Sequence, residues 1–481
     1  MNKKYLVLLS AVGVVIAGLS MKFDALDANA AASPKQPNFI VFYGEGAGWV
    51  STSVQMDDRN PASKGTINKT PNLERLAAAG MRFSDGYAPS PRCTPSRATI
   101  FTGRSPAALH MTFVGIGDGM GTGNITTKVI PVDASTELPL EETTIAELLK
   151  GSGYATAHFG KWHVGRVNPS QHGFDESDGP TSNGGPDNVS DPNPKQTLAM
   201  AQEGIAFMEK QIKAGKPFYL QLSQYPNQGA KSPQEISEEA HIIDSSYGQV
   251  MDAVQRLGIK DNTYIVYTTD HGTQGKNTPL SGGKGDVLEG GIRVPFLVAG
   301  PGIKAGTNSH VRVSGADLFP TFAALAGVKE AAMPKGVEGG SLVPVLTNAG
   351  VGAVKRSREE FVVHFPHYDK NPQGPASSIL LGDYKMTRLY ETGERRLFDL
   401  SKDPSESNDL AKQMPAKVAE LDARLTAYLK DINAQMPTMN PNADPTASAS
   451  KLPGERNGGG MDAAAAGMAA GGMAGGMAAT Q

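Results

Sequence analysis

Cysteine is almost absent from this chain of 481 residues, since Cys93 is the only one. A single thiol excludes every intramolecular disulfide, and it excludes zinc and iron–sulfur sites that need several cysteine ligands. Whatever chemistry Cys93 performs, it performs without a second thiol.

An excess of charge of one sign is also missing. The 45 basic and 48 acidic residues leave a net charge of −3, and neither sign forms a long run. We therefore expect no broad basic face for nucleic acid or for an anionic membrane. With 39% hydrophobic and 19% charged residues, the composition is typical of a globular protein with a sizeable core.

Long hydrophobic runs are missing as well, apart from one short run near the amino terminus. Lys3 and Lys4 precede apolar residues 5–19, a run shorter than the ~20 residues that a membrane-spanning helix needs. A polar stretch then ends in ANA at residues 28–30, and this order is typical of a secretory signal peptide over residues 1–30. The sequence predicts a periplasmic or secreted protein without stable membrane insertion.

Four short apolar runs are predicted to be strands buried on both faces. They cover residues 39–43, 218–222, 264–268 and 295–298. Between these runs, apolar side chains recur at spacings of three and four over residues 198–212 and 243–257, which predicts amphipathic helices. Buried strands that alternate with helices indicate an α/β fold, with a large, mostly parallel sheet sandwiched by helices, over residues 37–345.

The pattern changes after residue 345. Short strands predicted at residues 361–365, 378–381, 384–389 and 396–400 indicate a small antiparallel sheet. A proline and one apolar stripe predict a helix over residues 415–435, and together these elements form a C-terminal subdomain over residues 346–435. Residues 436–481 are rich in Gly, Ala and Met, and this low complexity predicts a disordered tail.

The strongest local signal lies at residues 93–104, which read CTPSRATIFTGR. Pro95 and the apolar residues after it place Cys93 at a helix N-terminus, where free N–H groups favour negative charge. The stretch resembles the maturation motif C-x-P-S-R, followed by T-G-R, of the sulfatase family. In that family a maturation enzyme oxidises the cysteine to formylglycine, and the hydrate of this aldehyde is the nucleophile.

The resemblance extends from residue 37 to about residue 410. Matching stretches read TPNLERLA at residues 70–77, GKWH at 160–163, GFD at 173–175, TDHG at 269–272, GGKG at 282–285, EGGIRVP at 289–295 and DLFPT at 317–321. Because ordered matches are more specific than any single motif, the chain resembles a divergent member of this family, with its alkaline phosphatase-like fold.

The resemblance implies a catalytic role for five residues. Cys93 supplies the nucleophile after maturation, and His163 lies beside it and assists its proton transfer. Arg97, Lys161 and Lys284 supply the fixed positive charge that a sulfate ester needs as its S–O bond breaks. Lys161 and Lys284 are also expected to bind the sulfate group.

A divalent cation is implied too, since a metal lowers the pKa of the nucleophilic hydroxyl in such sites. The family presents two adjacent aspartates after the first strand and an Asp-Asn or Asp-His pair after a later one. Here Asp270 and His271 match the second pair, and Glu45 keeps one carboxylate of the first. The expected ligands are Glu45, Asp270, His271 and the group at Cys93, with Ca²⁺ as the expected ion and Mg²⁺, Mn²⁺ or Zn²⁺ as alternatives.

Two positions depart from the family pattern. Gly46 stands where the second aspartate is usual, and Asp57 or Asp58 is a candidate replacement for its carboxylate. Residues 226–228 read PNQ where the family commonly has Ala-Pro-His. Gln228 can bind the substrate through a hydrogen bond but cannot donate a proton at neutral pH, so Lys284 becomes the leading general acid.

The sequence thus favours a sulfuric ester hydrolase that releases sulfate from an exported substrate, a sulfated carbohydrate or related small molecule. Two alternatives stay open. The Asp-His pair also occurs in related phosphonate and phosphodiester hydrolases, and the departures at Gly46 and Gln228 also fit a catalytically impaired protein that only binds sulfated glycans.

Overall fold

The computed structural model of this chain describes residues 36–115, 127–183, 196–226, 232–275, 277–369 and 373–443. All of them belong to one unit that begins at Gln36. The predicted signal peptide, Gln228 and the part of the predicted tail from residue 444 onward lie outside the described residues.

The central strand, β1 (Asn38–Gly44), is buried along its whole length and explains the layered architecture. Its side chains alternate between the two faces of the sheet, as in any strand. Phe39, Val41 and Tyr43 contribute to one hydrophobic core, and Ile40 and Phe42 to another. A strand with a core on each side needs a helical layer on each face.

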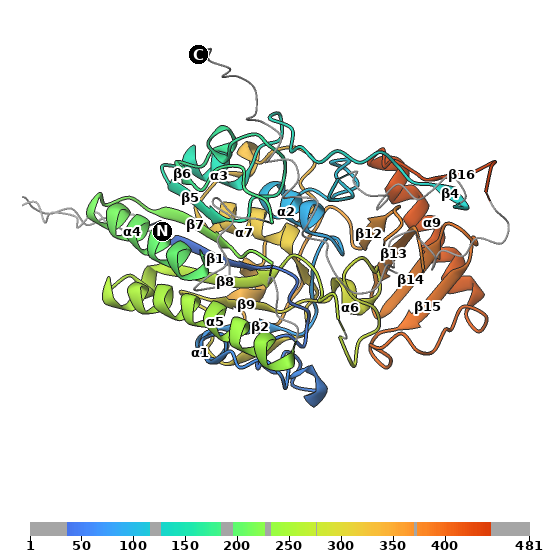
Figure 1. Ribbon diagram of the computed structural model, residues 1–481, viewed down its shortest axis with the longest axis horizontal. Coiled ribbons are helices and arrows are strands. Elements are labelled where there is room, and N and C mark those ends of the chain that lie inside the picture. Colours follow the sequence, from blue (N-terminus) through green and yellow to red (C-terminus); the bar gives the residue numbers. More distant parts are fainter. Residues whose placement is uncertain are drawn as a thin grey trace, which may run out of the picture. The chain divides into compact units, whose positions relative to one another are not determined.

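Eight strands form the main sheet, in the order β10-β2-β9-β8-β1-β7-β5-β6 (Figure 1). Besides β1 they are β2 (Met81–Phe83), β5 (Ala155–Gly160), β6 (Glu176–Ser177), β7 (Phe218–Ser223), β8 (Thr263–Thr269), β9 (Phe296–Ala299) and β10 (Thr307–Ser309). Only β9 runs antiparallel to its neighbours, β8 and β2. The four strands predicted from apolar runs and the mostly parallel sheet are confirmed.

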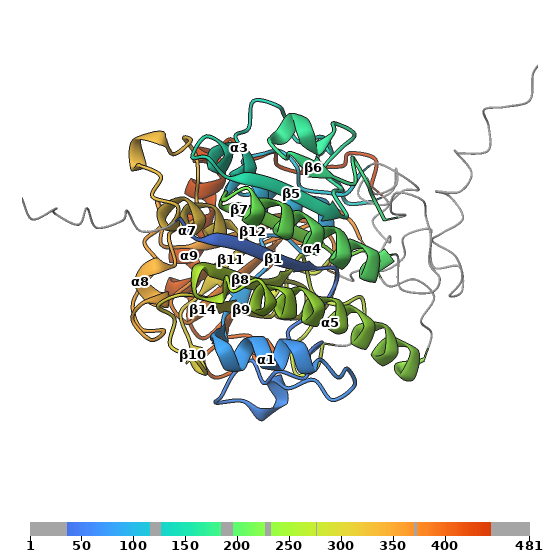
Figure 2. The same cartoon turned by 90° about the vertical axis from the view of Figure 1, so that its left-hand side faces the viewer.

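Helices cover both faces of this sheet. One layer contains α1 (Pro71–Ala79), α4 (Thr197–Lys213) and α5 (Pro233–Arg256), and the other contains α2 (Cys93–Thr102), α3 (Ile145–Lys150) and α7 (Leu318–Leu325). Figure 2 shows β1 and its neighbours between α4 and α5 on one side and α7 on the other. The helices predicted over residues 198–212 and 243–257 correspond to α4 and to the second half of α5.

The C-terminal part forms a separate antiparallel sheet of four strands, in the order β12-β13-β14-β15. They are β12 (Phe361–Phe365), β13 (Ala376–Leu381), β14 (Tyr384–Leu389) and β15 (Arg395–Asp399). Helix α9 (Pro415–Asp431) packs on this sheet through Leu421, Leu425 and Leu429. The predicted antiparallel sheet is confirmed, and the helix ends four residues earlier than predicted.

Two pairs of short strands and two short α-helices also occur in the described chain. They are the paired strands β3 (Gly86–Tyr87) and β11 (Val313–Ser314), the paired strands β4 (Val129–Ile130) and β16 (Thr438–Met439), and the helices α6 (Glu289–Ile292) and α8 (Val343–Leu346). Strand β16 lies in the segment that the sequence assigned to the tail, so the first residues of that segment are paired with the body of the protein.

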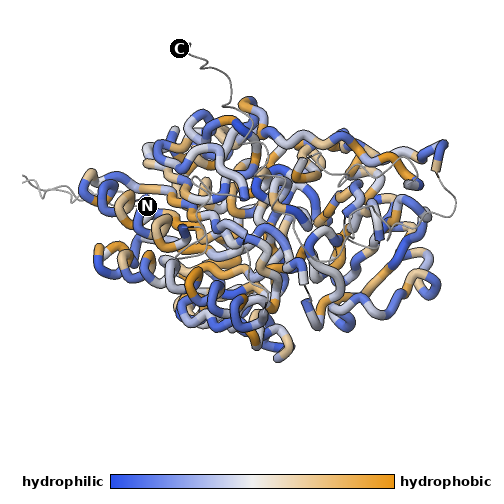
Figure 3. The backbone as a smooth tube through the Cα atoms, in the orientation of Figure 1, coloured by the Kyte–Doolittle hydropathy of each residue, from blue (hydrophilic) through white to orange (hydrophobic). Residues whose placement is uncertain are grey.

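Hydropathy follows the same layers. In Figure 3 the hydrophobic segments gather in the central strands, and the helices beside them alternate between hydrophobic and hydrophilic turns. Within the described residues, no helix combines the length and the apolar character needed to cross a membrane.

Candidate active site

Three strand ends bring the polar residues of the site to one edge of the sheet. In the parallel pair β1 and β8, Gly44 is in register with Thr269. Glu45 directly follows β1 and Asp270 directly follows β8, so these two residues lie side by side. Lys161 follows the end of β5 in the same way. This carboxyl-terminal edge is where parallel sheets generally place their ligands.

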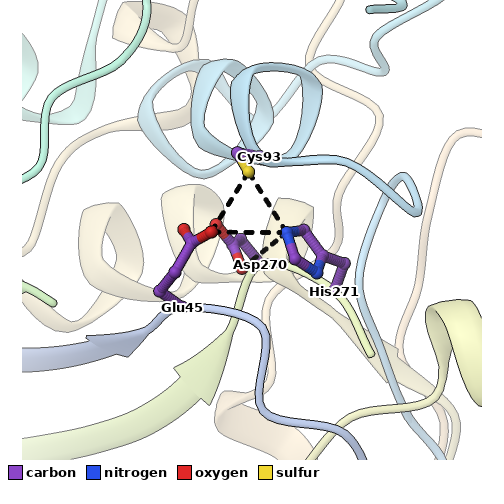
Figure 4. A group of neighbouring side chains, drawn as sticks. All are labelled: Glu45, Cys93, Asp270 and His271. Atoms are coloured by element: carbon purple, nitrogen blue, oxygen red, sulfur yellow. Dashed lines mark hydrogen bonds and ion pairs between the residues drawn. The ribbon is translucent and has the colours of Figure 1, made fainter. Parts of the chain in front are cut away.

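Cys93 approaches the same edge as the first residue of α2. Its Sγ lies 3.2 Å from Glu45 Oε1 and 3.2 Å from His271 Nε2 (Figure 4). The thiol is buried and free of any disulfide. Its sulfur stands at the position where a formylglycine hydrate would carry its hydroxyl oxygens.

In both carboxylates, of Glu45 and of Asp270, one oxygen binds basic side chains and the other oxygen faces His271. Glu45 Oε2 accepts hydrogen bonds from Lys161 Nζ at 2.7 Å and from Arg97 Nη2 at 3.0 Å, and Asp270 Oδ2 accepts one from Arg97 at 3.1 Å. Glu45 Oε1 and Asp270 Oδ1 instead lie 3.6 and 3.4 Å from His271 Nε2. These two oxygens have other contacts, with Cys93 and with the Gly46 N–H, but a carboxylate oxygen has two lone pairs, so each can still bind a further ligand.

The donor atoms that remain fit a divalent cation. One ligand atom each from Glu45, Cys93, Asp270 and His271 lies within 4.8 Å of the other three. His271 Nδ1 lies 2.9 Å from the carbonyl oxygen of Gly272 and donates to it, so Nε2 is the ring nitrogen that would bind a cation. Two carboxylate oxygens and an imidazole nitrogen suit Mn²⁺, Zn²⁺ or Mg²⁺, and they supply few of the six to eight oxygens that Ca²⁺ takes.

Burial and close charges shift the pKa values of Glu45, Asp270 and Cys93. Burial raises the pKa of Glu45, but Lys161 and Lys284 outweigh it and hold that pKa well below its usual range. Burial and the Glu45 charge raise the pKa of Asp270 to about 7. Burial and the Glu45 charge raise the pKa of the Cys93 thiol. Lys161 and Lys284 outweigh both effects and hold that pKa well below its ordinary value. Position 93 therefore favours an anion.

Arg97 and Lys284 complete the positive surroundings. Lys284 Nζ lies 3.5 Å from Glu45 Oε1. The fully buried Arg97 also donates from Nη1 to the carbonyl oxygen of Lys161 at 2.6 Å, and its guanidinium lies 5.2 Å from the centre of the Tyr43 ring. Arg97 thereby ties α2 to the ends of β1, β5 and β8.

His163 adopts a backbone φ of 54°, in the left-handed region that residues other than glycine rarely enter. Its N–H donates to the carbonyl oxygen of Thr181 at 2.9 Å, and its own carbonyl accepts from Thr94 Oγ1 at 2.8 Å. Its buried ring is close enough to Cys93 for the two side chains to interact electrostatically. Strained conformations of this kind cluster at functional sites, in agreement with a role beside the nucleophile.

Gly46 and His271 fit each other. Gly46 has a φ of +59°, and its N–H donates to Asp270 Oδ1 at 2.9 Å. A Cβ atom at position 46 would lie 3.3 Å from His271 Cε1. The imidazole therefore takes room beside the position where the family pattern has a second aspartate.

The structure brings most of the residues predicted from the sequence into one cluster: Glu45, Cys93, Arg97, Lys161, His163, Asp270, His271 and Lys284. Gln228 lies outside the described residues. Asp57 and Asp58 do not supply the missing carboxylate. They lie in a different group with His310, and Arg59 binds both oxygens of Asp57.

One polar contact next to the nucleophile was missed by the sequence analysis. Arg92, the N-cap residue of α2, donates to both carboxylate oxygens of the buried Asp369. Asp369 also packs against Gly285, where a Cβ atom would lie 2.6 Å from Asp369 Oδ2. The segment after β12 thus helps to place both Cys93 and Lys284. No local pattern marks the pair, because 277 residues separate its members.

The chain matches two protein families along its length. Residues 37–328 match the family described as sulfatase, and residues 284–435 match the family described as N-sulphoglucosamine sulphohydrolase, C-terminal. The first match contains every residue of the cluster, and the second contains the antiparallel sheet and α9.

Curated relatives and a solved structure agree with these matches. N-acetylgalactosamine-6-sulfatase of Mus musculus is 31% identical over 379 residues, which cover 68% of this chain and 69% of the relative. Arylsulfatase A of Homo sapiens is 28% identical, and the matched region covers 82% of this chain and 90% of the relative. The crystal structure of Ps i-CgsB in complex with k-i-k-neocarrahexaose has the same fold, with a TM-score of 0.66, 23% identity, and coverage of 85% of this chain and 94% of that one.

The match over residues 37–328 shows the family. The fold and the cluster of eight predicted site residues agree with that match. The chain is therefore a hydrolase that belongs to the sulfatase family.

Proposed function

We propose that this protein is an exported, periplasmic or secreted hydrolase that releases sulfate from a sulfated carbohydrate. It uses formylglycine made from Cys93 by a maturation enzyme, together with one divalent cation. The observation that carries the proposal is the convergence of Glu45 Oε1, Asp270 Oδ1 and His271 Nε2 near Cys93 Sγ, with lysines beside it. N-terminal sequencing of the exported protein checks the expected cleavage after Ala30.

Glu45, Asp270 and His271 would hold the cation. The hydrate of formylglycine at position 93 would supply a hydroxyl nucleophile, and a bound cation would lower the pKa of that hydroxyl. In the net reaction, water provides an oxygen to sulfur and the ester S–O bond breaks. The alcohol leaves with one proton, and the second proton is released with sulfate.

The basic residues bind and orient the ester. Lys161 and Lys284 stand on two sides of Glu45 and are placed to bind sulfate oxygens, whose charge redistributes as the bond breaks. Lys284 is also the N–H donor that we propose for the leaving oxygen, since position 228 carries an amide instead of an imidazole. His163, held by Thr94 and Thr181, is placed to take the proton of the nucleophilic hydroxyl.

Comparison of ester classes tests the proposal. Protein whose formylglycine content has been established by mass spectrometry is expected to have a kcat/KM at least about tenfold higher for an aryl sulfate than for the matched aryl phosphonate and phosphodiester. A higher kcat/KM for the phosphorus esters would assign the site to phosphonate or phosphodiester hydrolysis. Binding of sulfated glycan without turnover would identify a catalytically impaired binding protein.

The cation site makes a second prediction. Chelator-stripped protein is expected to bind one divalent ion, and Glu45→Gln should weaken that binding at least about tenfold, because the substitution removes one of two anionic ligands. Calorimetric titration with Ca²⁺, Mg²⁺, Mn²⁺ and Zn²⁺ measures both affinities. Glu209→Gln, at an exposed ion pair on α4, is the matched control and should leave binding unchanged. Failure of the stripped wild-type protein to bind any of the four ions at millimolar concentration would refute the site.

A further inference from the structure

A cavity of about 320 Å³ opens directly beside the nucleophile. Glu45, His271 and Lys284 form its inner end, and it continues between the segment after β1 and the helices α1 and α5. Its volume lies at the small end of the range for ligand pockets, ~300–1,000 Å³, which suits a single ring more than an extended chain. We name it the α1–α5 cavity.

Positive charge is missing from the α1–α5 cavity beyond its inner end. Among the described residues that line it, Asp244 is the only charged one apart from Glu45, His271 and Lys284. Asp244 is buried, and its oxygens accept hydrogen bonds from the backbone N–H groups of Asn72 and Leu73, both at 2.9 Å. A second anionic group on a substrate would therefore meet a carboxylate and no cationic side chain among these described lining residues, and burying an unpaired charge is costly.

Neutral polar groups are present instead. The Thr52 hydroxyl is buried, and it has no hydrogen-bond partner within the described chain. Asn68 Oδ1 is equally without a partner there, although Asn68 Nδ2 donates to the carbonyl oxygen of Ser51 at 2.7 Å. Buried polar atoms are normally paired, so these two point to hydroxyl or amide groups of a ligand.

The other walls are largely apolar. Leu73, Ile243, Tyr247 and Tyr267 form the side made by α1, α5 and β8. An apolar side opposite uncharged hydrogen-bonding groups is the surface expected for a ring with one apolar face and hydroxyls at its edge.

The passage from the cavity to the nucleophile is left open by small residues. Gly46 and Ala47 line the cavity next to Glu45. A Cβ atom at Gly46 would meet only the His271 ring within 4 Å, so no other described side chain crowds this position. A ring joined through its ester oxygen to a sulfate between Lys161 and Lys284 can therefore enter the α1–α5 cavity.

We infer that the α1–α5 cavity binds the leaving alcohol of the substrate, and that this alcohol is one uncharged hydroxylated ring, a neutral sugar unit, in preference to a uronate or a multiply sulfated unit. The inference rests on the proposed sulfatase function and narrows its substrate class. It assigns selectivity to Asp244 and to the absence, among the described residues that line the cavity, of any cationic side chain beyond the inner end.

A matched substrate pair tests the inference on the full-length matured protein. N-acetylgalactosamine that carries one sulfate is expected to have a kcat/KM at least about tenfold higher than the same sugar with two sulfates. Gln274→Lys, at the exposed rim of the cavity, should shift this ratio toward the disulfated sugar by about tenfold or more. Gln202→Lys, on the exposed surface of α4, is the matched control and should leave the ratio unchanged.

A filling variant gives an independent measurement. Ala240→Phe places a ring in the cavity from α5 and should raise KM for the monosulfated sugar severalfold. An equal or higher kcat/KM for the disulfated sugar, or an Ala240→Phe protein with unchanged KM, would overturn the inference while sulfatase activity stands. Absence of turnover on every sulfate ester by protein with verified formylglycine would instead overturn the proposed function.

Discussion

Replacing Cys93 with alanine is expected to lower kcat/KM for an aryl sulfate by on the order of 10⁴-fold or more, because loss of a covalent nucleophile removes most of the catalytic advantage of such a site. The structure makes position 93 the meeting point of the whole cluster. Its Sγ lies 3.2 Å from both Glu45 Oε1 and His271 Nε2. Initial rates and the mass of the peptide that contains residue 93 are measured together.

The mass measurement separates the nucleophile from its maturation. In the active wild-type protein the peptide should be lighter than the unmodified cysteine form, as expected for formylglycine. Thr99→Ala is the matched control, since Thr99 is buried in the same helix and its hydroxyl donates only to the Pro95 carbonyl oxygen. That variant should keep its activity within a few-fold. An active wild-type enzyme with an unmodified thiol at position 93 would contradict the mechanism.

The main sheet could be predicted from the sequence because burial leaves a local signature. Strands covered on both faces consist of short apolar runs, such as residues 39–43 and 264–268, and both occur as β1 and β8. The antiparallel direction of β9 could not be predicted in this way. Its run resembles the others, and its direction depends on the connection from β8 and on pairing with β2.

The site was predictable where the relevant residues follow strands. Glu45 and Asp270 are adjacent because β1 and β8 are paired in register. A family motif at the end of each strand already suggested that the two residues belong to one site. The prediction that Asp57 replaces the missing carboxylate rested on its proximity to Glu45 along the chain, and it was wrong. In the structure Asp57 is hydrogen-bonded to Arg59 and Ser63 and does not turn back to Glu45. The contact of Arg92 with Asp369 depends on how the C-terminal segment packs, which no pattern in either segment encodes.

Replacing Arg97 with alanine is the substitution with the largest expected effect on stability, about 3–5 kcal/mol in the free energy of unfolding. Arg97 Nη2 contacts Glu45 Oε2 at 3.0 Å and Asp270 Oδ2 at 3.1 Å, and the guanidinium and both carboxylates are almost fully buried. Removal of the guanidinium leaves two buried carboxylates facing each other with one cation fewer. Urea denaturation of the chelator-treated protein measures the loss without stabilisation by a bound cation.

Two further variants distinguish this explanation from a general effect of losing an arginine. Arg256→Ala removes the partner of Glu209 at an exposed pair, so it should cost no more than about 1 kcal/mol. Arg97→Lys keeps the charge, but one ammonium group cannot replace the planar guanidinium that joins Glu45, Asp270 and the Lys161 carbonyl. The free energy of unfolding of this variant should therefore lie between those of the wild type and of Arg97→Ala. If Arg97→Ala destabilised the protein no more than Arg256→Ala, the buried ion cluster would not hold α2 to the strand ends. The cluster would then serve catalysis alone.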